Sequence, residues 1–225
     1  MRRLLHENGL SITLGSLFLV FWLGQSVVGH REHNADQAEH GRPQVAYTAY
    51  LRSAHFWEAT GENWESEFLQ LFSYVFLTAL LVQKGSAESK KPDEAEAVDR
   101  DPRAHRAPRD KASAPWPVRR GGWILKLYEN SLSLAFLLLF LVSIGVHAVA
   151  GASEFNQEQA QHGVPGTLSA IQYAGTSRFW SESLQNWQSE FLAIAAMVVL
   201  SIFLRQRGSP ESKPVDSPHG QTGSG

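Results

Sequence analysis

Two carboxylates stand at equivalent places in a repeated phrase of this 225-residue sequence. Residues 63–68 read NWESEF and residues 186–191 read NWQSEF, and each phrase leads into an apolar run. A carboxylate inside a membrane is costly to bury, so such residues commonly bind a cation, pass a proton or pair with one another. Glu67 and Glu190 are therefore the first candidates for chemistry.

The residues around each carboxylate form one candidate polar cluster with two copies. Its members are Asn63, Trp64 and Glu67 in the first copy, and Asn186, Trp187 and Glu190 in the second. A purely structural interpretation competes with the chemical one. In it the tryptophans belong to the aromatic belt of a membrane interface, Asn63 or Ser66 caps a helix, and the carboxylate lies near a helix N-terminus, where the helix dipole favours negative charge.

Four further residues join the candidate cluster. Gln25 and His147 occupy equivalent positions near the outer ends of two apolar runs, where snorkelling to the interface explains them, although both could lie close to Glu67 and Glu190. His40 and His162 end the repeated phrase N-x-x-Q-x-x-H-G-x-P. We expect that phrase to form a short helix stopped by Gly41 and Pro43, and by Gly163 and Pro165, whose side chains hydrogen-bond the neighbouring N-W-x-S-E-F helix.

Metal and enzyme chemistry find little support in the sequence. His30, His33, Asp36 and His40 have helix-compatible spacing for a metal site, but only His40 has a histidine counterpart in the second copy. There is no cysteine, and neither nucleotide-binding, zinc-protease nor serine-hydrolase motifs occur. The sequence predicts no catalytic residue, no metal and no cofactor.

The elements that position the candidates are four apolar runs, at residues 10–28, 68–82, 132–149 and 191–204. The first and third carry no charged residue and nearly cover a hydrocarbon core of about 30 Å, at a rise of about 1.5 Å per residue. The second and fourth are shorter, so a buried or re-entrant helix competes with a full crossing unless each extends back to its N-W-x-S-E-F phrase. The predicted fold is an all-α integral membrane protein with four transmembrane helices.

An internal duplication accounts for the repeated phrases. The sequences LHENGLS (5–11) and LYENSLS (127–133) align at an offset of 122, whereas the tryptophan phrases and GSAESK (85–90) with GSPESK (208–213) align at 123. Each copy holds two runs, so the copies are expected to face the same way, as two parallel two-helix repeats with a small helical cap outside the membrane. Because the third run resembles the first, we interpret the first as a retained helix and not a cleaved signal peptide.

These motifs also resemble a known family. The E-N-x-L-S start, the N-W-x-S-E-F phrase and the G-S-x-E-S-K exit together are similar to bacterial inner-membrane proteins grouped as a domain of unknown function. The resemblance covers both repeats and omits the linker and the tail. It implies a bacterial origin and a membrane location, and it brings no activity with it.

The predicted organisation has four parts. Repeat 1 covers 1–85, with spans at about 10–28 and 64–82 and an outer cap at 29–63. Repeat 2 covers 121–208, with spans at about 131–150 and 187–204 and an outer cap at 151–186. The polar, Pro- and Ala-rich linker 86–120 and the tail 209–225 are expected to be disordered cytoplasmic segments.

Charge distribution sets the expected orientation. Residues 83–126 contain eleven Lys and Arg, against three in 29–67 and one in 151–190. The positive-inside rule therefore places the N-terminus, linker and C-terminus in the cytoplasm. The membrane is then the bacterial inner membrane that the family resemblance implies. Basic residues in the linker alternate with acidic ones, so no nucleic-acid partner is expected.

Two functions remain open at this level. The first is a non-enzymatic scaffold, stress-response or envelope-interaction component, whose partners are the lipid bilayer and a second copy of the chain or another membrane protein. The alternative is a small-ion or proton transport component that uses Glu67 and Glu190.

Overall fold

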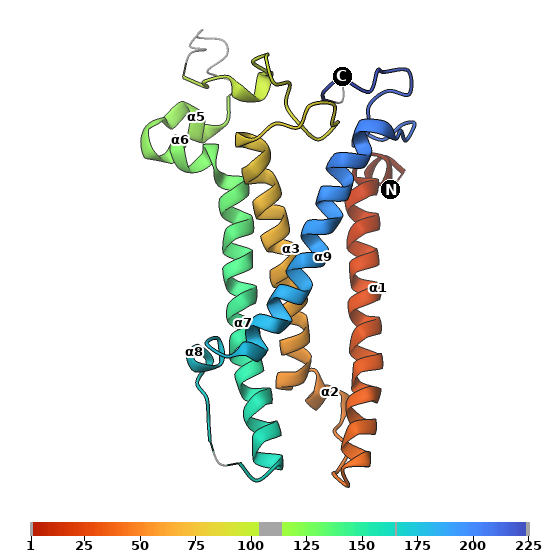
Figure 1. Cartoon of the computed structure of the whole chain (residues 1–225), viewed down its shortest axis with the longest axis vertical. Coiled ribbons are helices and arrows are strands. Elements are labelled where there is room, and N and C mark those ends of the chain that lie inside the picture. The colour runs from red at the N-terminus through yellow and green to blue at the C-terminus, as the bar shows by residue number, and fades with distance from the viewer. Residues whose placement is uncertain (1, 104–113, 165, 224–225) are drawn as a thin grey trace. The chain divides into compact units, whose positions relative to one another are not determined.

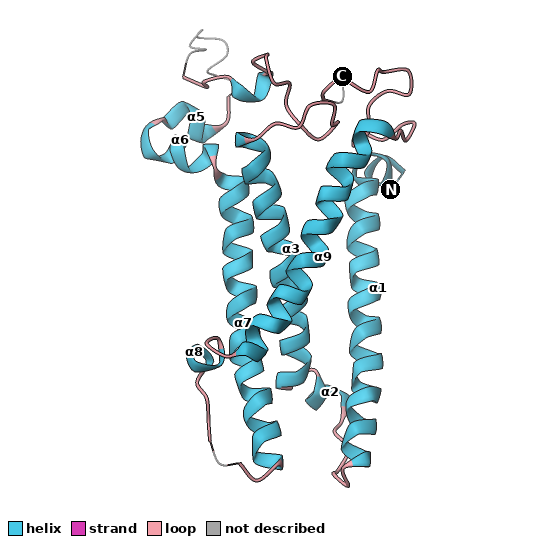
Figure 2. Ribbon diagram, viewed as in Figure 1, coloured by secondary structure: helices cyan, strands magenta, loops and turns pink. Residues whose placement is uncertain are grey.

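The computed structural model describes residues 2–103, 114–164 and 166–223. Within these ranges the chain forms helices joined by turns and loops, and no strand (Figures 1 and 2). The helices are α1 (Arg2–Glu39), α2 (Tyr47–Tyr50), α3 (Ala54–Leu80), the 3-10 helix η1 (Ala97–Asp99), α5 (Trp116–Arg120), α6 (Gly122–Glu129), α7 (Ser131–Gln161), α8 (Ala170–Tyr173) and α9 (Ser177–Phe203). The predicted all-helical class is confirmed.

Three of the helices are long and apolar enough to cross a membrane: α1 from His6 to Glu39, α7 and α9. Helix α3 has the same length as α9, 27 residues, but is not among the three. Its first half contains four glutamates, Glu58, Glu62, Glu65 and Glu67, which lower its mean hydropathy. The fourth span therefore remains a prediction, and α3 is the helix on which it depends.

The long helices begin and end at different residues from those expected. Helices α1 and α7 continue to Glu39 and Gln161, so the N-x-x-Q-x-x-H phrase extends each helix and does not form a separate short one. They stop as predicted at Gly41 and Gly163, whose positive φ values of 66° and 70° suit glycine. Pro165, the second predicted stop signal, lies outside the described residues.

The N-W-x-S-E-F phrases lie inside their helices. Helix α3 begins at Ala54 and α9 at Ser177, so neither Asn63 nor Ser66 is a helix cap. Capping falls instead to Ser53 and Thr176, whose hydroxyls accept hydrogen bonds from the backbone N–H groups of Phe56 and Phe179, both at 3.3 Å. The tryptophan stripe upstream of each phrase continues the helix, which is why the true caps stand ten residues earlier.

The described chain divides into two compact units. Unit 1 comprises residues 1–61 and 146–175, and therefore contains α1, α2 and α8 with the start of α3 and the end of α7. Unit 2 comprises residues 62–145 and 176–225, and contains α5, α6 and α9 with most of α3 and the first half of α7.

Unit 1 is built around two buried tyrosines. Tyr50, 3% exposed, packs against Phe56 with ring centroids 5.7 Å apart, and Tyr173 is fully buried. A Cβ atom at Gly29 would overlap the Tyr50 hydroxyl, and one at Gly151 would overlap the Tyr173 ring. Two glycines at equivalent positions of α1 and α7 thus make room for two tyrosines at equivalent positions.

Matched asparagine clamps fix the loops that follow α1 and α7. The Asn34 amide accepts from the Val45 N–H at 2.8 Å and donates to the Val45 carbonyl at 3.1 Å. Asn156 makes the same two bonds to Leu168, at 2.8 and 2.9 Å. The repeated asparagines therefore bind the loop of their own copy, and not the N-W-x-S-E-F helix as predicted, because α1 and α7 run on far enough to place them beside these loops.

Unit 2 has polar groups inside and apolar groups outside. Glu65 and Ser183 are fully buried, whereas Leu192 and Phe203 of α9 are 71% and 57% exposed. A protein in water would show the reverse arrangement. This pattern agrees with the membrane-length helices and suits apolar faces that meet lipid.

The described part of the C-terminal tail winds around one lysine. Lys213 is 1% exposed, and its ammonium donates to the carbonyl oxygens of Gly85, Pro218, His219 and Gln221 at 2.6 to 3.4 Å. Composition predicts disorder for 209–225, whereas the structure places 209–223 in turns, because several carbonyl acceptors converge on one cation. Residues 104–113 of the linker and 224–225 of the tail lie outside the described ranges.

Candidate functional site

A ladder of polar contacts joins α3 to α9 in unit 2. Asn186 donates to the Glu62 carboxylate at 2.6 Å, and the Ser183 hydroxyl donates to the Glu65 carboxylate, also at 2.6 Å. Further along both helices, Gln70 donates to the backbone carbonyl of Glu190 at 2.9 Å. Short bonds to carboxylates are among the stronger hydrogen bonds in proteins, so these contacts hold the two helices in register.

Glu65 is the fully buried carboxylate of this ladder. Its side chain is fully buried, as is Ser183, and Ser66 beside it is 3% exposed. Removing a carboxylate from water is costly unless hydrogen bonds and charge partners replace the lost hydration. A carboxylate in this setting, carried by a helix with an apolar second half, is the arrangement that proton relays and ion sites in membranes use.

Polar side chains continue along the same helix toward its C-terminal end. Ser66, Gln70 and Tyr74 recur at every fourth residue, a spacing that keeps them near one face of α3. The Tyr74 hydroxyl then donates to Glu88 at 2.6 Å in the loop after the helix. The chain of polar groups therefore runs from Glu62 to Glu88.

The far end of this stripe is acidic. Burial, together with the negative charge of Glu211, raises the pKa of Glu88, while the hydrogen bond from Tyr74 acts in the opposite direction. Glu88 and Glu211 occupy the same position of the two G-S-x-E-S-K phrases. Beside them the hydroxyls of Ser86 and Ser201 lie 2.9 Å apart, so polar contacts also join the two copies here.

The sequence-predicted cluster is only partly brought together in unit 2. Asn63 and Glu67 are exposed on α3, whereas Asn186 and Glu190 meet Glu62 and Gln70 as described above. Trp64 is half-buried. Trp187 is also half-buried and packs edge-to-face against Phe140 and Trp180, with centroids 6.1 and 6.0 Å away.

Sequence reasoning missed Glu62 and Glu65. Comparison of the two copies identifies acidic residues that occur in both. Glu62 and Glu65 do not, because they align with Gln185 and Gln188. The available signal was the spacing of Glu58, Glu62 and Glu65, which at four and three residues places them along one helical face.

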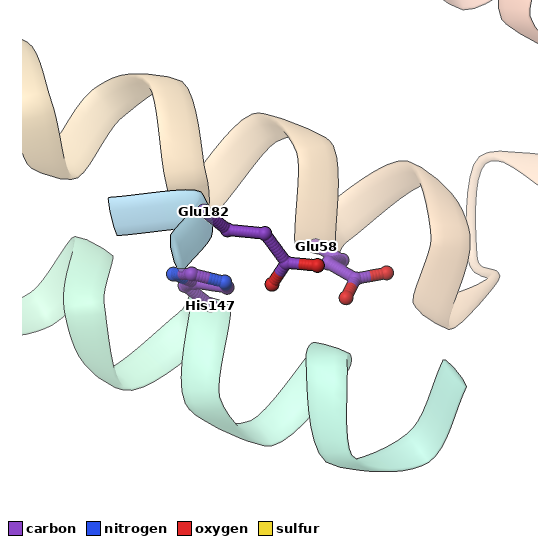
Figure 3. A group of neighbouring side chains, drawn as sticks. All are labelled: Glu58, His147 and Glu182. Carbon is purple, nitrogen blue, oxygen red and sulfur yellow. The ribbon is translucent and has the colours of Figure 1, made fainter. Parts of the chain in front are cut away.

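A second buried polar group lies in unit 1. His147 on α7 is fully buried beside Glu58 on α3, which is 8% exposed, and their ligand atoms lie within 4.8 Å of each other (Figure 3). The Tyr173 hydroxyl donates to Glu58 at 3.3 Å. This pair can exchange a proton or supply two ligands to a metal ion.

The remaining candidates lie apart from this pair. Gln25 is exposed, unlike its counterpart His147, so the two do not share an environment. His40 and His162 are also exposed, and His40 contacts the backbone carbonyl of Asp36, in the last turn of α1, at 2.9 Å. Of these four predicted site residues, His147 is therefore buried, whereas Gln25, His40 and His162 lie at the surface.

The comparisons with known proteins extend this description. A family model described as a domain of unknown function, DUF6766, matches residues 1–224. The chain belongs to this family. The resemblance expected from the repeated motifs is confirmed, and the family match covers the linker and most of the tail as well as both repeats. No curated protein and no solved structure matches the chain.

Proposed function

We propose that this member of the DUF6766 family moves protons or small cations across the membrane through the polar stripe on α3. The observation that carries the proposal is the full burial of the Glu65 carboxylate within a ladder of hydrogen bonds. Ionisable residues inside membrane helices are rare, and they mark ion and proton pathways more often than they mark structural positions.

The order of groups along the stripe suits proton transfer better than cation binding. Carboxylates stand at both ends of the stripe, Glu62 and Glu65 at one and Glu88 at the other, with the amide of Gln70 and the hydroxyl of Tyr74 between them. Carboxylates accept and release protons, and hydroxyl groups both donate and accept hydrogen bonds. A dedicated cation cage would instead gather six or more oxygens around one point.

The first test is proton flux into proteoliposomes that contain the purified protein. We expect Glu65→Gln to reduce pH-driven flux by about tenfold or more, because an amide cannot carry the transferred proton. Glutamine keeps the shape of the side chain and can still bond to Ser183, so the fold should survive. The readout is a pH-sensitive dye trapped inside the vesicles, with protein-free vesicles as the baseline.

Glu67→Gln is the matched control. It makes the same chemical change two residues away, at an exposed position of the same helix. We expect its flux to equal that of the unmodified protein. Flux in Glu65→Gln equal to that in the control, with helicity retained in circular dichroism, would reject the proposed pathway.

The proposed architecture is a multi-pass protein of the bacterial inner membrane, formed by two parallel repeats with cytoplasmic termini. The matched Asn34 and Asn156 clamps support the duplication, since the same amide binds the same loop position in each copy. The excess of Lys and Arg in 83–126 supports the orientation.

A reporter experiment tests whether α3 crosses the membrane. A reporter that is active only in the cytoplasm, fused after Lys91 or after Gly225, is expected to be active in both fusions. Two crossings, by α1 and α3, would return the chain to the side on which it started. If α1, α7 and α9 crossed and α3 did not, Lys91 and Gly225 would both lie outside the cytoplasm, so both fusions would be inactive.

A second candidate function is a non-enzymatic scaffold or envelope-stress component. The observation that favours it is that unit 1 contains matched structural contacts in both copies, namely the asparagine clamps and the close glycine–tyrosine contacts. Its partners would be lipid and a second copy or another membrane protein, with no nucleic acid. A folded protein that conducts no protons but crosslinks to itself in native membranes would favour this function over transport.

A further inference from the structure

A polar cavity of about 300 Å³ lies within unit 1, at the ends of α1 and α7 that follow their apolar runs. Two histidines line it, His33 and His55, together with four carboxylates and a single guanidinium, that of Arg42. The carboxylates belong to Glu32, Asp36, Glu154 and Glu158. Imidazole and carboxylate in one cavity, with an excess of negative charge, are the ligands that divalent transition metals use in proteins.

One pair of groups already has the separation of two ligands on one metal. The His55 Nδ1 atom lies 3.5 Å from the Glu154 Oε1 atom. Two ligand atoms at about 2.0 to 2.1 Å from a tetrahedral zinc ion lie about 3.3 Å apart. The two groups come from α3 and α7, so the fold and not local sequence sets this distance.

The second histidine stands at a fitting distance from the first. The ring centroids of His33 and His55 are 5.1 Å apart. Two imidazoles bound to one tetrahedral ion have centroids about 5 Å apart, as follows from metal–nitrogen bonds of about 2.0 Å. Coordination by His33 as well requires its ring to turn toward the other two ligands, and the ring's hydrogen-bond contact with Gln37 is a long one of 3.4 Å.

Two nearby histidines, His30 and His40, do not line the cavity. His30 Nε2 lies 2.8 Å from the Val45 carbonyl and 2.9 Å from the Asn34 amide, and His40 contacts Asp36. The helix-spaced set that the sequence suggested, His30, His33, Asp36 and His40, is therefore not the set that surrounds the cavity. Of its members, His33 and Asp36 line the cavity.

We propose that this cavity binds one divalent transition-metal ion, with His33, His55 and Glu154 as its protein ligands. The three ligands come from α1, α3 and α7, so the ion links three helices of unit 1. A fourth position remains for water or for Glu158, which lines the same cavity. This site is separate from the α3 stripe in unit 2 and does not depend on the proposed transport function.

The test uses the full-length protein in detergent, treated with a chelator and then titrated with Zn²⁺ in a calorimeter. We expect one equivalent to bind to the unmodified protein. The variants His55→Gln and Glu154→Gln are each expected to weaken binding by about tenfold or more, since losing even a supporting residue costs about that much. Replacing Zn²⁺ with Co²⁺ should give the strong visible absorption of tetrahedral coordination.

His40→Gln is the matched control because His40 directly follows the last residue of α1, the helix of His33, and does not line the cavity. Its Zn²⁺ affinity should equal that of the unmodified protein. Two results would overturn the site: no stoichiometric binding by protein that circular dichroism shows to be helical, or equal affinity in the His55→Gln variant. Glu154→Gln guards against misfolding, since its amide can still accept a hydrogen bond from His55.

Discussion

Replacing Gly61 with alanine is expected to lower the free energy of unfolding by about 1 to 3 kcal/mol. A Cβ atom at Gly61 would lie 2.8 Å from the backbone nitrogen of His147 and 3.1 Å from a Val146 methyl group. The first of these neighbours is backbone and cannot rotate away. Helices α3 and α7 must therefore separate locally, and the packing between them is lost.

The same change should also affect the Glu58–His147 pair. Glu58 lies one turn before Gly61, and it is the close approach at Gly61 that brings this carboxylate within 4.8 Å of His147. Small residues allow helix backbones to approach in this way in membrane proteins. The Gly61→Ala variant should therefore also lose the Glu58–His147 contact.

Gly24→Ala serves as the control for helix propensity. Gly24 lies in α1, and no heavy atom lies within 4 Å of a Cβ placed there. Alanine is the better helix former, so this variant should be unchanged or more stable by up to about 1 kcal/mol. The measurement is unfolding of detergent-purified protein followed by circular dichroism. Equal stability changes for Gly61→Ala and Gly24→Ala would contradict the close approach described here.

Much of the fold could be predicted from the sequence because membrane helices carry a strong hydropathy signal. The charge-free runs at 10–28 and 132–149 lie within α1 and α7, and the run at 191–204 lies within α9 apart from its last residue. Helix ends were predicted less well. Polar residues after an apolar run can continue a helix, as they do up to Glu39 and Gln161, and hydropathy does not detect this continuation.

The candidate site could be predicted only in outline. The helices that carry it, and the phrase that contains Glu65, were identified, but the buried carboxylates were not. Glu62 and Glu65 bond to Asn186 and Ser183. The residues that align with these glutamates in the second copy are different ones, Gln185 and Gln188. Comparison of two copies favours residues that are alike, whereas packing one copy against the other pairs residues that are complementary.

The asymmetry of the copies also bears on mechanism. In the first copy the stripe continues through Gln70 and Tyr74, and the second copy has Ala193 and Met197 at those positions. Helix α9 therefore supplies hydrogen-bond partners near one end of the stripe, at Ser183 and Asn186, and mainly apolar surface further along. If the proposed transport function holds, this division predicts one proton path per chain, along α3 and beside α9.

Replacing Asn156 with alanine is expected to lower the free energy of unfolding by about 2 kcal/mol, within a range of roughly 1 to 3 kcal/mol. The amide of Asn156 satisfies both the N–H and the carbonyl group of Leu168, at 2.8 and 2.9 Å. Alanine leaves both backbone groups without this partner. The loop that leads into α8, and with it the buried Tyr173, should then lose its fixed position.

Gln157→Ala is the matched control, because Gln157 is the next residue of α7 and is exposed, with one long 3.3 Å contact to Ser153. Its effect should stay within about 0.5 kcal/mol. Asn34→Ala removes the equivalent clamp on Val45, and we expect a loss of stability similar to that of Asn156→Ala. Thermal unfolding of the three variants in one detergent makes the comparison. If Asn156→Ala were as stable as Gln157→Ala, the clamp would not hold the loop. If Asn156→Ala lowered the stability but Asn34→Ala did not, the two asparagines would not play the same structural part in the two copies, and the proposed duplication would lose this structural support.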